Sequence, residues 1–195
     1  MRLEMSTADN TVKVWDPLVR IGHWTLVIAF FTAYFTEDDF LITHVWAGYI
    51  LGFVVCFRLI WGFVGTSNAR FTSFVRSPST TIKYLADLAR KRSRRYIGHN
   101  PAGGAMILAL LILLAGTVFS GVMVYGLEDG AGPLAGFLTE NAEQEELWEE
   151  IHEVIANLTL LMVGVHVAGM LFSAYAHREN LVKAMITGRK KVSND

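Results

Sequence analysis

Residues 149–169, EEIHEVIANLTLLMVGVHVAG, place His152 at the start of a long apolar run and His166 deep inside it. A run of this length provides the roughly 20 residues that a helix needs to cross the hydrocarbon core of a bilayer. An ionisable side chain inside such a span is costly and normally faces a partner or a cavity within the protein. The stretch therefore predicts a transmembrane helix that carries two imidazoles into the interior of a helical bundle.

Three further apolar stretches extend this prediction to the whole chain. Of its 195 residues, 52% are hydrophobic, which is high for a soluble domain of this size. We expect an all-α membrane protein, a bundle of four transmembrane helices that forms a single domain over residues 1–195. The expected spans are about 17–36, 43–64, 101–127 and 148–176, and a basic loop covers 65–100.

The first span is the shortest, because Arg20 and Glu37 limit its apolar part. Its alternative interpretation is a cleaved signal peptide. A small-residue cleavage site would then follow Phe35, but the chain continues into Glu37, Asp38 and Asp39. The acidic continuation favours a retained span.

Charged residues set the expected orientation, because Lys and Arg near the ends of spans are retained on the cytoplasmic side. Residues 65–100 carry eight Lys or Arg, and the tail after Tyr175 carries five, whereas 36–42 and 127–150 carry none. Both termini of this multi-pass membrane protein should therefore be cytoplasmic. The outer loops hold eleven carboxylates: Glu37, Asp38, Asp39, Glu128, Asp129, Glu140, Glu143, Glu145, Glu146, Glu149 and Glu150.

The inner loop contains the pattern of a short interfacial helix. Ser77 is suited to cap it and Pro78 to occupy its first position, and apolar residues follow at helical spacing. The basic residues after it would face anionic lipid headgroups, and an ordinary topology signal explains them equally well. No feature indicates recognition of nucleic acid. The apolar residues of this pattern are Ile82, Leu85 and Leu88, and the basic residues after it are Arg90, Lys91, Arg92, Arg94 and Arg95.

Cys56 is the only cysteine and falls inside the second span. One cysteine cannot form a disulfide framework, an iron–sulfur cluster or a covalent C-x-x-C-H haem attachment. These redox centres are therefore excluded.

Counting residues from the outer end of each expected helix places four histidines at two depths. Fourteen residues of helix amount to about 21 Å and leave His152 and His166 about 40° apart on one face. His44 opens the second span as His152 opens the fourth, and His23 lies fourteen residues before Glu37. We therefore expect an outer pair, His44 with His152, and an inner pair, His23 with His166.

Two neutral imidazoles from different helices suit an iron porphyrin, because the macrocycle supplies the other four ligands. Zinc is less suitable, since its structural sites take four protein ligands and its catalytic sites take three. A single histidine in an apolar helix is usually a core or helix-end residue, but four at matched depths favour two non-covalent haems b. His99 and His177 have no partner by this count, and we expect both at the membrane interface.

Three other residues of the second span fit a flat cofactor. Gly48 and Gly52 follow His44 at one and two turns and would leave space beside its ring, although glycines in a span equally mark close helix packing. Arg58 lies fourteen residues after His44, at the depth of the inner pair. A buried guanidinium needs an anion, which a haem propionate would provide, and snorkelling to the inner headgroups is the alternative.

The chain resembles the bacterial di-haem cytochrome b family, which includes bacterial cytochrome b-561 and the b-type cytochrome subunits of nickel-iron hydrogenases and formate dehydrogenases. The likeness covers nearly the whole chain. Its motifs are VRIGHW at 19–24, HVWAG at 44–48, FRLIWGFVG at 57–65, GHNP at 98–101 and IHE at 151–153.

The resemblance implies a four-helix bundle with one haem b near each membrane surface, bound through His23, His44, His152 and His166. It also implies electron exchange between membrane quinone or quinol and a periplasmic partner, either a c-type cytochrome or an oxidoreductase subunit. By position, it would place the quinone near Asn100, Pro101 and Gly103. The same residues also fit a plain helix start, with Asn100 as the cap. The short acidic outer loops differ from what a large hydrogenase-type docking surface needs.

Two other function classes remain open at this point. A stand-alone membrane oxidoreductase could oxidise a small species such as superoxide at the outer haem and reduce quinone, but eleven outer carboxylates would repel an anion. A non-redox transporter or anchor would be favoured by broken helices and inverted repeats, which the sequence does not show. We expect an electron carrier or oxidoreductase subunit rather than a stand-alone enzyme. The oligomeric state is open, a homodimer included.

Overall fold

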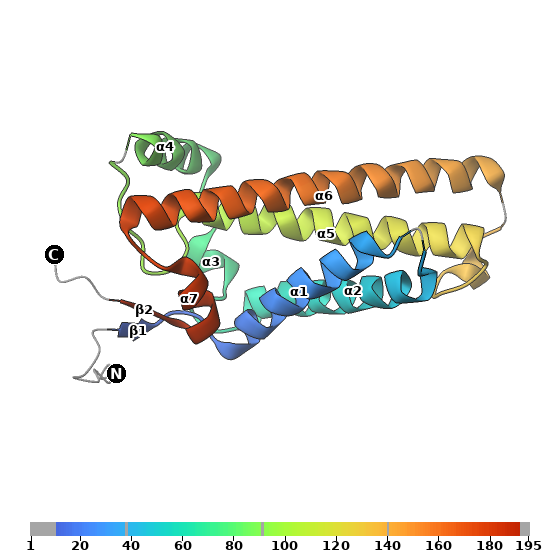
Figure 1. Ribbon diagram of the computed structural model, residues 1–195, viewed down its shortest axis with the longest axis horizontal. Helices are drawn as coiled ribbons and strands as arrows, with labels where there is room; N and C mark the ends of the chain where they lie inside the picture. Colours follow the sequence, from blue (N-terminus) through green and yellow to red (C-terminus); the bar gives the residue numbers. More distant parts are fainter. Residues whose placement is uncertain (1–10, 38, 91, 140, 192–195) are drawn as a thin grey trace. The chain divides into compact units, whose positions relative to one another are not determined.

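The computed structural model describes residues 11–37, 39–90, 92–139 and 141–191 (Figure 1). Asp38, Lys91 and Glu140, which figured among the charged residues above, lie outside them. Within these ranges, four helices are long and apolar enough to cross a membrane, in agreement with the four predicted spans. They are α1 (Pro17–Phe35), α2 (Leu41–Val64), α5 (Pro101–Glu128) and α6 (Ala142–His177).

Helix α6 begins earlier than the sequence predicted, because the acidic stretch expected in the outer loop is helical from Ala142. Asn141 caps this end, where its side-chain oxygen accepts a hydrogen bond of 3.1 Å from the backbone N–H of Gln144. Glu143 and Glu145 lie in the first turn, where carboxylates interact favourably with the positive end of the helix dipole. The outer carboxylates therefore stand partly on a rigid helix.

Shorter elements complete the fold. They are α3 (Phe71–Phe74), α4 (Pro78–Ala89), the 3₁₀ helix η1 (Ala135–Phe137), α7 (Leu181–Thr187) and the strands β1 (Thr11–Lys13) and β2 (Arg189–Lys191). The strands pair antiparallel, with Val12 opposite Lys190. Gly188 makes the turn from α7 into β2 in the left-handed conformation, with φ of 77°. This small sheet corrects the all-α expectation, since the chain is mostly but not entirely helical.

The predicted start of α4 is confirmed. Ser77 is its N-cap, with a side-chain oxygen that accepts from the backbone N–H of Thr80, and Pro78 is its first residue. Leu88 is buried, whereas Ile82 and Leu85 are 67% and 49% exposed. The helix therefore presents apolar side chains on its outer surface, as an interfacial helix does.

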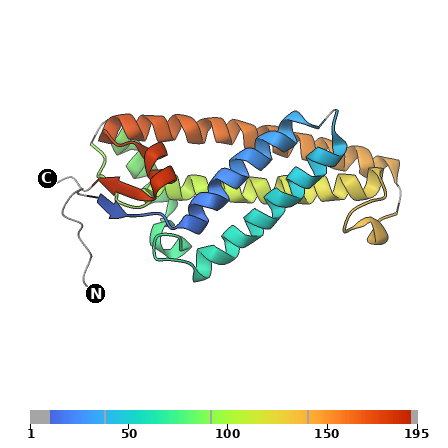
Figure 2. The same cartoon turned by 60° about the horizontal axis from the view of Figure 1, so that its bottom comes forward.

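The described residues form two compact units. Unit 1 consists of the described residues within Met1–His23, Arg58–Met106 and Val167–Asp195. Unit 2 consists of those within Trp24–Phe57 and Ile107–His166. Unit 2 is a bundle of four helix segments, from α1, α2, α5 and α6 (Figures 1 and 2). Unit 1 contains the sheet and the short helices α3, α4 and α7.

Unit 1 has a small core around Val14, Trp15 and Ala184, against which Val12 and Met185 pack. This core joins β1 and the turn after it to α7 (Figure 2). Asp16 holds the same region to the end of α2, because its carboxylate accepts hydrogen bonds from the Thr66 hydroxyl at 2.6 Å and from Trp61 at 3.3 Å. Side-chain hydrogen bonds therefore hold Asp16, the residue directly before α1, against the end of α2.

Candidate functional site

The outer pair of histidines meets inside unit 2. His44 lies in the first turn of α2 and His152 on α6, and their ring centres are 6.0 Å apart with ring planes at 81°. The two residues are separated by more than a hundred positions in the sequence. The depth count thus named two residues that the fold brings into contact.

Each ring of the pair is held through its Nδ1 atom. His44 Nδ1 lies 2.9 Å from the backbone oxygen of Ala33 on α1, and His152 Nδ1 lies 3.0 Å from the hydroxyl of Ser120 on α5. A metal-binding histidine characteristically donates its second N–H to such an acceptor, which fixes the tautomer and the ring orientation. In both rings this arrangement leaves Nε2 for another partner.

The spacing of the rings fits a metal ion bound between them. Two metal–nitrogen bonds of about 2 Å, with about 1.2 Å from each nitrogen to its ring centre, separate the ring centres by at most about 6.4 Å. The observed 6.0 Å is close to this value. In the part of the chain that the structure describes, no three His, Cys, Asp or Glu side chains gather into a metal site. A metal held by this pair would therefore take its remaining ligands from a macrocycle such as porphyrin.

A cavity beside the pair opens between all four helix segments of unit 2. Part of this cavity is open to the surroundings. Most of its lining is apolar or aromatic. The lining residues are Phe30, Ala33, Tyr34, Glu37, His44, Val45, Gly48, Tyr49, Leu51, Thr117, Val118, Gly121, Val122, Tyr125, His152 and Ala156.

The two glycines of α2 differ in their surroundings. A Cβ atom on Gly48 would meet nothing within 4 Å, so this glycine leaves open space in the cavity next to His44. A Cβ on Gly52 would lie 3.0 Å from Cγ1 of Val118, so here the missing side chain permits close packing of α2 against α5. Gly48 therefore has the surroundings expected beside a flat cofactor, and Gly52 those of a packing contact.

Several residues that hold the site were not predicted from the sequence. Ser120 bonds His152, and Gly121 gives the same ring room, since a Cβ there would lie 2.9 Å from Cε1 of His152. A signal for them is present in the sequence. Small or polar residues at 116, 117, 120 and 121 share one face of an otherwise apolar helix, and that face meets α6, where the Thr117 and Thr159 hydroxyls lie 3.2 Å apart.

The two histidines of the predicted inner pair belong to different units. His23 lies on α1 and belongs to unit 1, whereas His166 lies on α6 and belongs to unit 2. Each is in contact with other parts of the protein. Their pairing stays a prediction from the sequence.

Arg58 lies near the end of α2, within unit 1. One of its nitrogens, Nη2, donates to the backbone oxygen of Ala69 at 3.1 Å, and its guanidinium lies over the rings of Phe71 and Phe74 at 5.2 and 6.0 Å. The other nitrogen, Nη1, is buried and finds no hydrogen-bond partner among the described residues. A buried donor of this kind fits an anionic oxygen, such as that of a propionate.

His99 lies beside Arg58, between two aromatic rings. Its ring centre is 4.3 Å from that of Trp15 and 4.5 Å from that of Phe74. Burial and the nearby positive charges of Arg58 and Lys190 together lower the pKa of His99 to about 3. The imidazole is therefore neutral at physiological pH and acts as a packing ring. The other histidine without a predicted partner, His177, bonds the Ser93 hydroxyl through Nε2 at 3.2 Å.

The residues predicted to lie near a quinone form the start of α5. Asn100 caps the helix, because its side-chain oxygen accepts a hydrogen bond of 2.7 Å from the backbone N–H of Gly103. Pro101 is the first helical residue. The alternative interpretation of this motif as a helix start is thus confirmed, and a role in quinone binding stays a prediction.

Comparisons with known proteins identify the family of this chain. The family model described as prokaryotic cytochrome b561 matches residues 14–188. A protein of Azotobacter vinelandii named probable Ni/Fe-hydrogenase B-type cytochrome subunit is 24% identical over 223 residues, covering 96% of this chain and 91% of that protein. A protein of the same name from Azotobacter chroococcum mcd 1 has the same identity and coverage. No solved structure gives a significant match.

Proposed function

Since the chain belongs to the prokaryotic cytochrome b561 family, we propose that it carries electrons across the bacterial cytoplasmic membrane through two non-covalent haems b. The outer haem is bound by His44 and His152 and the inner one by His23 and His166. Bound haem supplies one-electron oxidation and reduction at its iron. The protein supplies the ligands, holds them in position and surrounds the cofactor with apolar side chains.

The observation that carries the proposal is the geometry of the outer pair. The ring centres of two imidazoles from different helices lie 6.0 Å apart, close to the separation expected for two ligands of one metal, and Nδ1 of each ring faces a protein acceptor. A histidine pair that only bridged two helices would hydrogen-bond ring to ring, whereas the described bonds of His44 and His152 go to Ala33 and Ser120. The cavity next to the rings and the open space at Gly48 lie where a macrocycle bound by the pair would have to fit.

The inner haem rests on the sequence count and on Arg58. The buried Nη1 of Arg58 is a donor in need of an acceptor, and a propionate of the inner haem would supply one. The two aromatic rings under the guanidinium restrict where it can reach. Both features favour an anion site over snorkelling.

Quinone is proposed to exchange electrons with the inner haem near Asn100, Pro101 and Gly103. The side-chain oxygen of Asn100 is occupied in the helix cap, which leaves the amide nitrogen as the group that would donate to a quinone carbonyl. Pro101 is buried, whereas Gly103 is partly exposed and has no side chain, so a flat ring would approach the backbone of this turn at Gly103.

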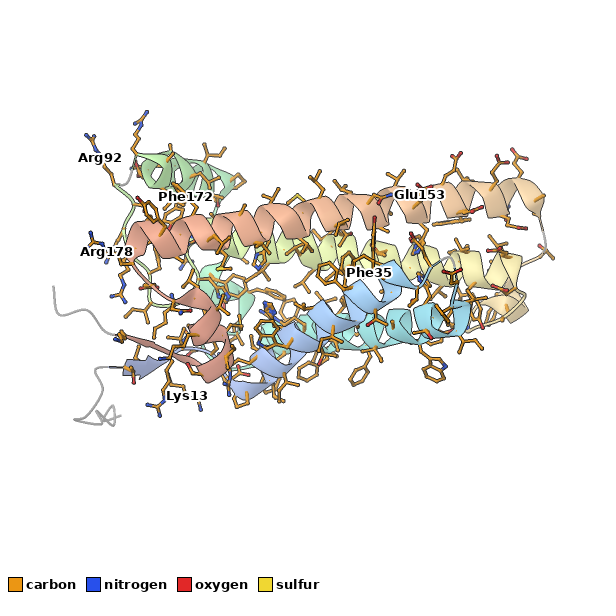
Figure 3. The ribbon with its side chains drawn as sticks, in the orientation of Figure 1. Lys13, Phe35, Arg92, Glu153, Phe172 and Arg178 are labelled. Carbon is orange, nitrogen blue, oxygen red and sulfur yellow. The ribbon has the colours of Figure 1, made fainter. Side chains whose placement is uncertain are left out.

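The charge distribution supports a cationic periplasmic partner, such as a c-type cytochrome or a basic oxidoreductase subunit. On unit 1, Lys13, Arg92 and Arg178 are exposed and their side chains point away from the ribbon (Figure 3). Glu37, Asp129 and most carboxylates of α6 are exposed on unit 2. Lys and Arg mark the cytoplasmic side, so the acidic residues would face the periplasm and steer a cation. The name of the Azotobacter relatives adds a hydrogenase to the candidate partners.

The proposal is tested by haem content and absorption spectra of purified protein. We expect two haems b per chain, loss of one in His44→Ala and in His152→Ala, and loss of the other in His166→Ala. His177→Ala is the matched control, because this histidine bonds Ser93 and is not a proposed ligand. A protein without Soret absorption, or ligand variants with the spectrum of the control, would refute the proposal.

Partner docking has a separate test. Association with a cationic c-type cytochrome should slow as ionic strength rises, because salt screens the attraction between exposed charges. A rate that does not depend on salt would exclude electrostatic steering by the acidic residues, while leaving the haem proposal intact.

A further inference from the structure

The hydroxyl of Ser120 is the side-chain partner of a proposed haem ligand. Ser120 lies on α5 and is 1% exposed, and its Oγ is 3.0 Å from Nδ1 of His152. Because water has no access to this hydroxyl, the bond to the imidazole is not exchanged with solvent.

The surroundings of Ser120 determine which atom of this bond carries the proton. Its Oγ also lies 2.9 Å from the backbone oxygen of Gly116 and 3.1 Å from that of Thr117. Both carbonyls can only accept, so the single hydroxyl proton goes to them, as is usual for a serine that bonds back to its own helix. Toward His152 the oxygen is therefore an acceptor, and Nδ1 of His152 carries the hydrogen.

The other contacts of the pair agree with this assignment. The Thr117 carbonyl also interacts with the His152 ring, and it too can only accept. His44 faces the carbonyl of Ala33 and must likewise carry its hydrogen on Nδ1. Both rings then present the lone pair of Nε2, which is the form that binds a metal.

We propose that Ser120 is a positioning residue, which holds His152 in its metal-binding tautomer and, through that bond, lowers the reduction potential of the outer haem. The inference rests on the proposed function, since it assigns a role toward the haem of His44 and His152. An acceptor on Nδ1 makes an imidazole a stronger electron donor and raises ligand basicity. A stronger donor stabilises ferric over ferrous iron, so the potential falls.

The hydrogen-bond acceptors of His44 and His152 are different kinds of group. The acceptor for His44 is a backbone oxygen, which side-chain substitution leaves in place, whereas the acceptor for His152 is a side chain. A substitution of Ser120 alone can therefore change the strength of the hydrogen bond to His152.

The test compares Ser120→Ala with two matched variants by redox titration of the purified holoprotein, followed by absorption. Ser120→Cys keeps the shape of the side chain, with a somewhat larger atom at its end, and offers a weaker acceptor. Thr159→Val removes another fully buried hydroxyl, on α6, which bonds Ile155 and Thr117 but not His152. Carbon monoxide binding to the reduced protein reports how firmly the iron holds its ligands.

We expect Ser120→Ala to keep the inner haem unchanged and to raise the potential of the outer one. Loss of such a partner typically weakens metal binding by about 10–100-fold. If ferric iron loses ten times more affinity than ferrous iron, the potential rises by about 59 mV. Ser120→Cys should fall between Ser120→Ala and wild type, and carbon monoxide should bind only where the ligand has loosened.

Two results would overturn the inference. One is an outer potential in Ser120→Ala equal to that of wild type, because the Thr117 carbonyl would then suffice. The other is the same change in Thr159→Val as in Ser120→Ala, which would show a general effect of lost packing. Either result leaves the haem proposal standing as long as His44→Ala and His152→Ala remove the outer haem.

Discussion

A Cβ atom on Gly121 would lie 2.9 Å from Cε1 of His152. Carbon atoms in contact prefer about 3.5–4.0 Å, so any side chain here must push the imidazole away. His152 is also held by Ser120, the neighbouring residue on α5, and cannot move without straining that bond. Gly121 is thus part of the structure that aims the ring.

We predict that Gly121→Ala lowers the occupancy of the outer haem and leaves the inner one in place. The measurement is the ratio of haem to protein after purification, with the two haems resolved by their spectra. Gly164→Ala on α6 is the control, because a Cβ there meets nothing within 4 Å and alanine favours a helix. Equal haem content in both variants would contradict the prediction.

The contact between His44 and His152 could be predicted from the sequence because it depends on depth alone. Each histidine lies close to the outer end of a predicted span whose ends are marked by charge, so residue counting places both at one level. The bond from His152 to Ser120 depends on something else, namely the rotation of α5 about its axis. Small and polar residues at 116, 117, 120 and 121 mark one face of this apolar helix, but they do not show which residue of α6 that face meets.

The ends of the elements were predicted with uneven success for a similar reason. Ser77 and Asn100 cap their helices as expected, because capping is a local interaction over three residues. The six residues before the predicted start of α6 look like a polar loop by hydropathy, and their helix depends on the Asn141 cap and on carboxylates in the first turn. The pairing of β1 with β2 joins residues at opposite ends of the chain, so no local pattern shows it.

Glu179 links two segments of unit 1 to the end of α6. Its carboxylate forms ion pairs with Arg95 and, at 3.1 Å, with Lys190, whose side chain is 8% exposed. Burial would raise the pKa of Glu179, but the hydrogen bond from Arg95 and the charge of Lys190 outweigh it and lower the pKa. The carboxylate is therefore stabilised in its charged form.

We predict that Glu179→Gln destabilises unit 1 by about 2 kcal/mol, between the values for an exposed and a fully buried ion pair. The loss should appear as faster proteolysis or hydrogen exchange in residues 181–191. Glu146→Gln, at an exposed position of α6, is the control and should behave as wild type. If the two variants exchange at the same rate, the ion pairs contribute nothing measurable.

Asp16 has two separable roles, as a helix cap and as a link to α2. Its Oδ1 accepts from the backbone N–H of Val19 at 2.9 Å, and its Oδ2 accepts from Thr66 and Trp61. Burial would raise the pKa of Asp16, but these hydrogen bonds outweigh it and lower the pKa. The stability from the charged form is present above the ordinary value of 3.8 and is lost as the pH falls through the lowered pKa.

We predict that Asp16→Ala lowers the free energy of unfolding by about 1–2 kcal/mol, the usual cost of a lost cap, with a further loss from the freed Thr66 hydroxyl. Asp16→Asn should cost about half as much, because its amide oxygen still accepts from Val19. Thermal unfolding of the purified variants measures both. Equal midpoints for Asn and Ala would show that the charge, and not the cap, matters.

His99 gives unit 1 a dependence on pH in the mildly acidic range. Its pKa of about 3 lies below the ordinary 6.5, because burial between Trp15 and Phe74 disfavours the charged form and Arg58 and Lys190 repel it. Between these two values the unfolded chain binds a proton that the folded chain does not. Stability is therefore complete above pH 6.5 and falls as the pH is lowered toward 3.

We predict that lowering the pH from 7 to 5 reduces the local stability of unit 1 by about 2 kcal/mol, at about 1.4 kcal/mol per pH unit. Asp16 and Glu179 act in the same direction, but their lowered pKa values place their effect below this range. His99→Phe keeps an aromatic ring between Trp15 and Phe74 and carries no proton, so its stability should stay constant from pH 7 to 5. Hydrogen exchange of residues 11–16, corrected for the intrinsic effect of pH, measures the difference. A wild-type protein that loses no more protection than His99→Phe would show that the imidazole is already free to take up a proton in the folded state.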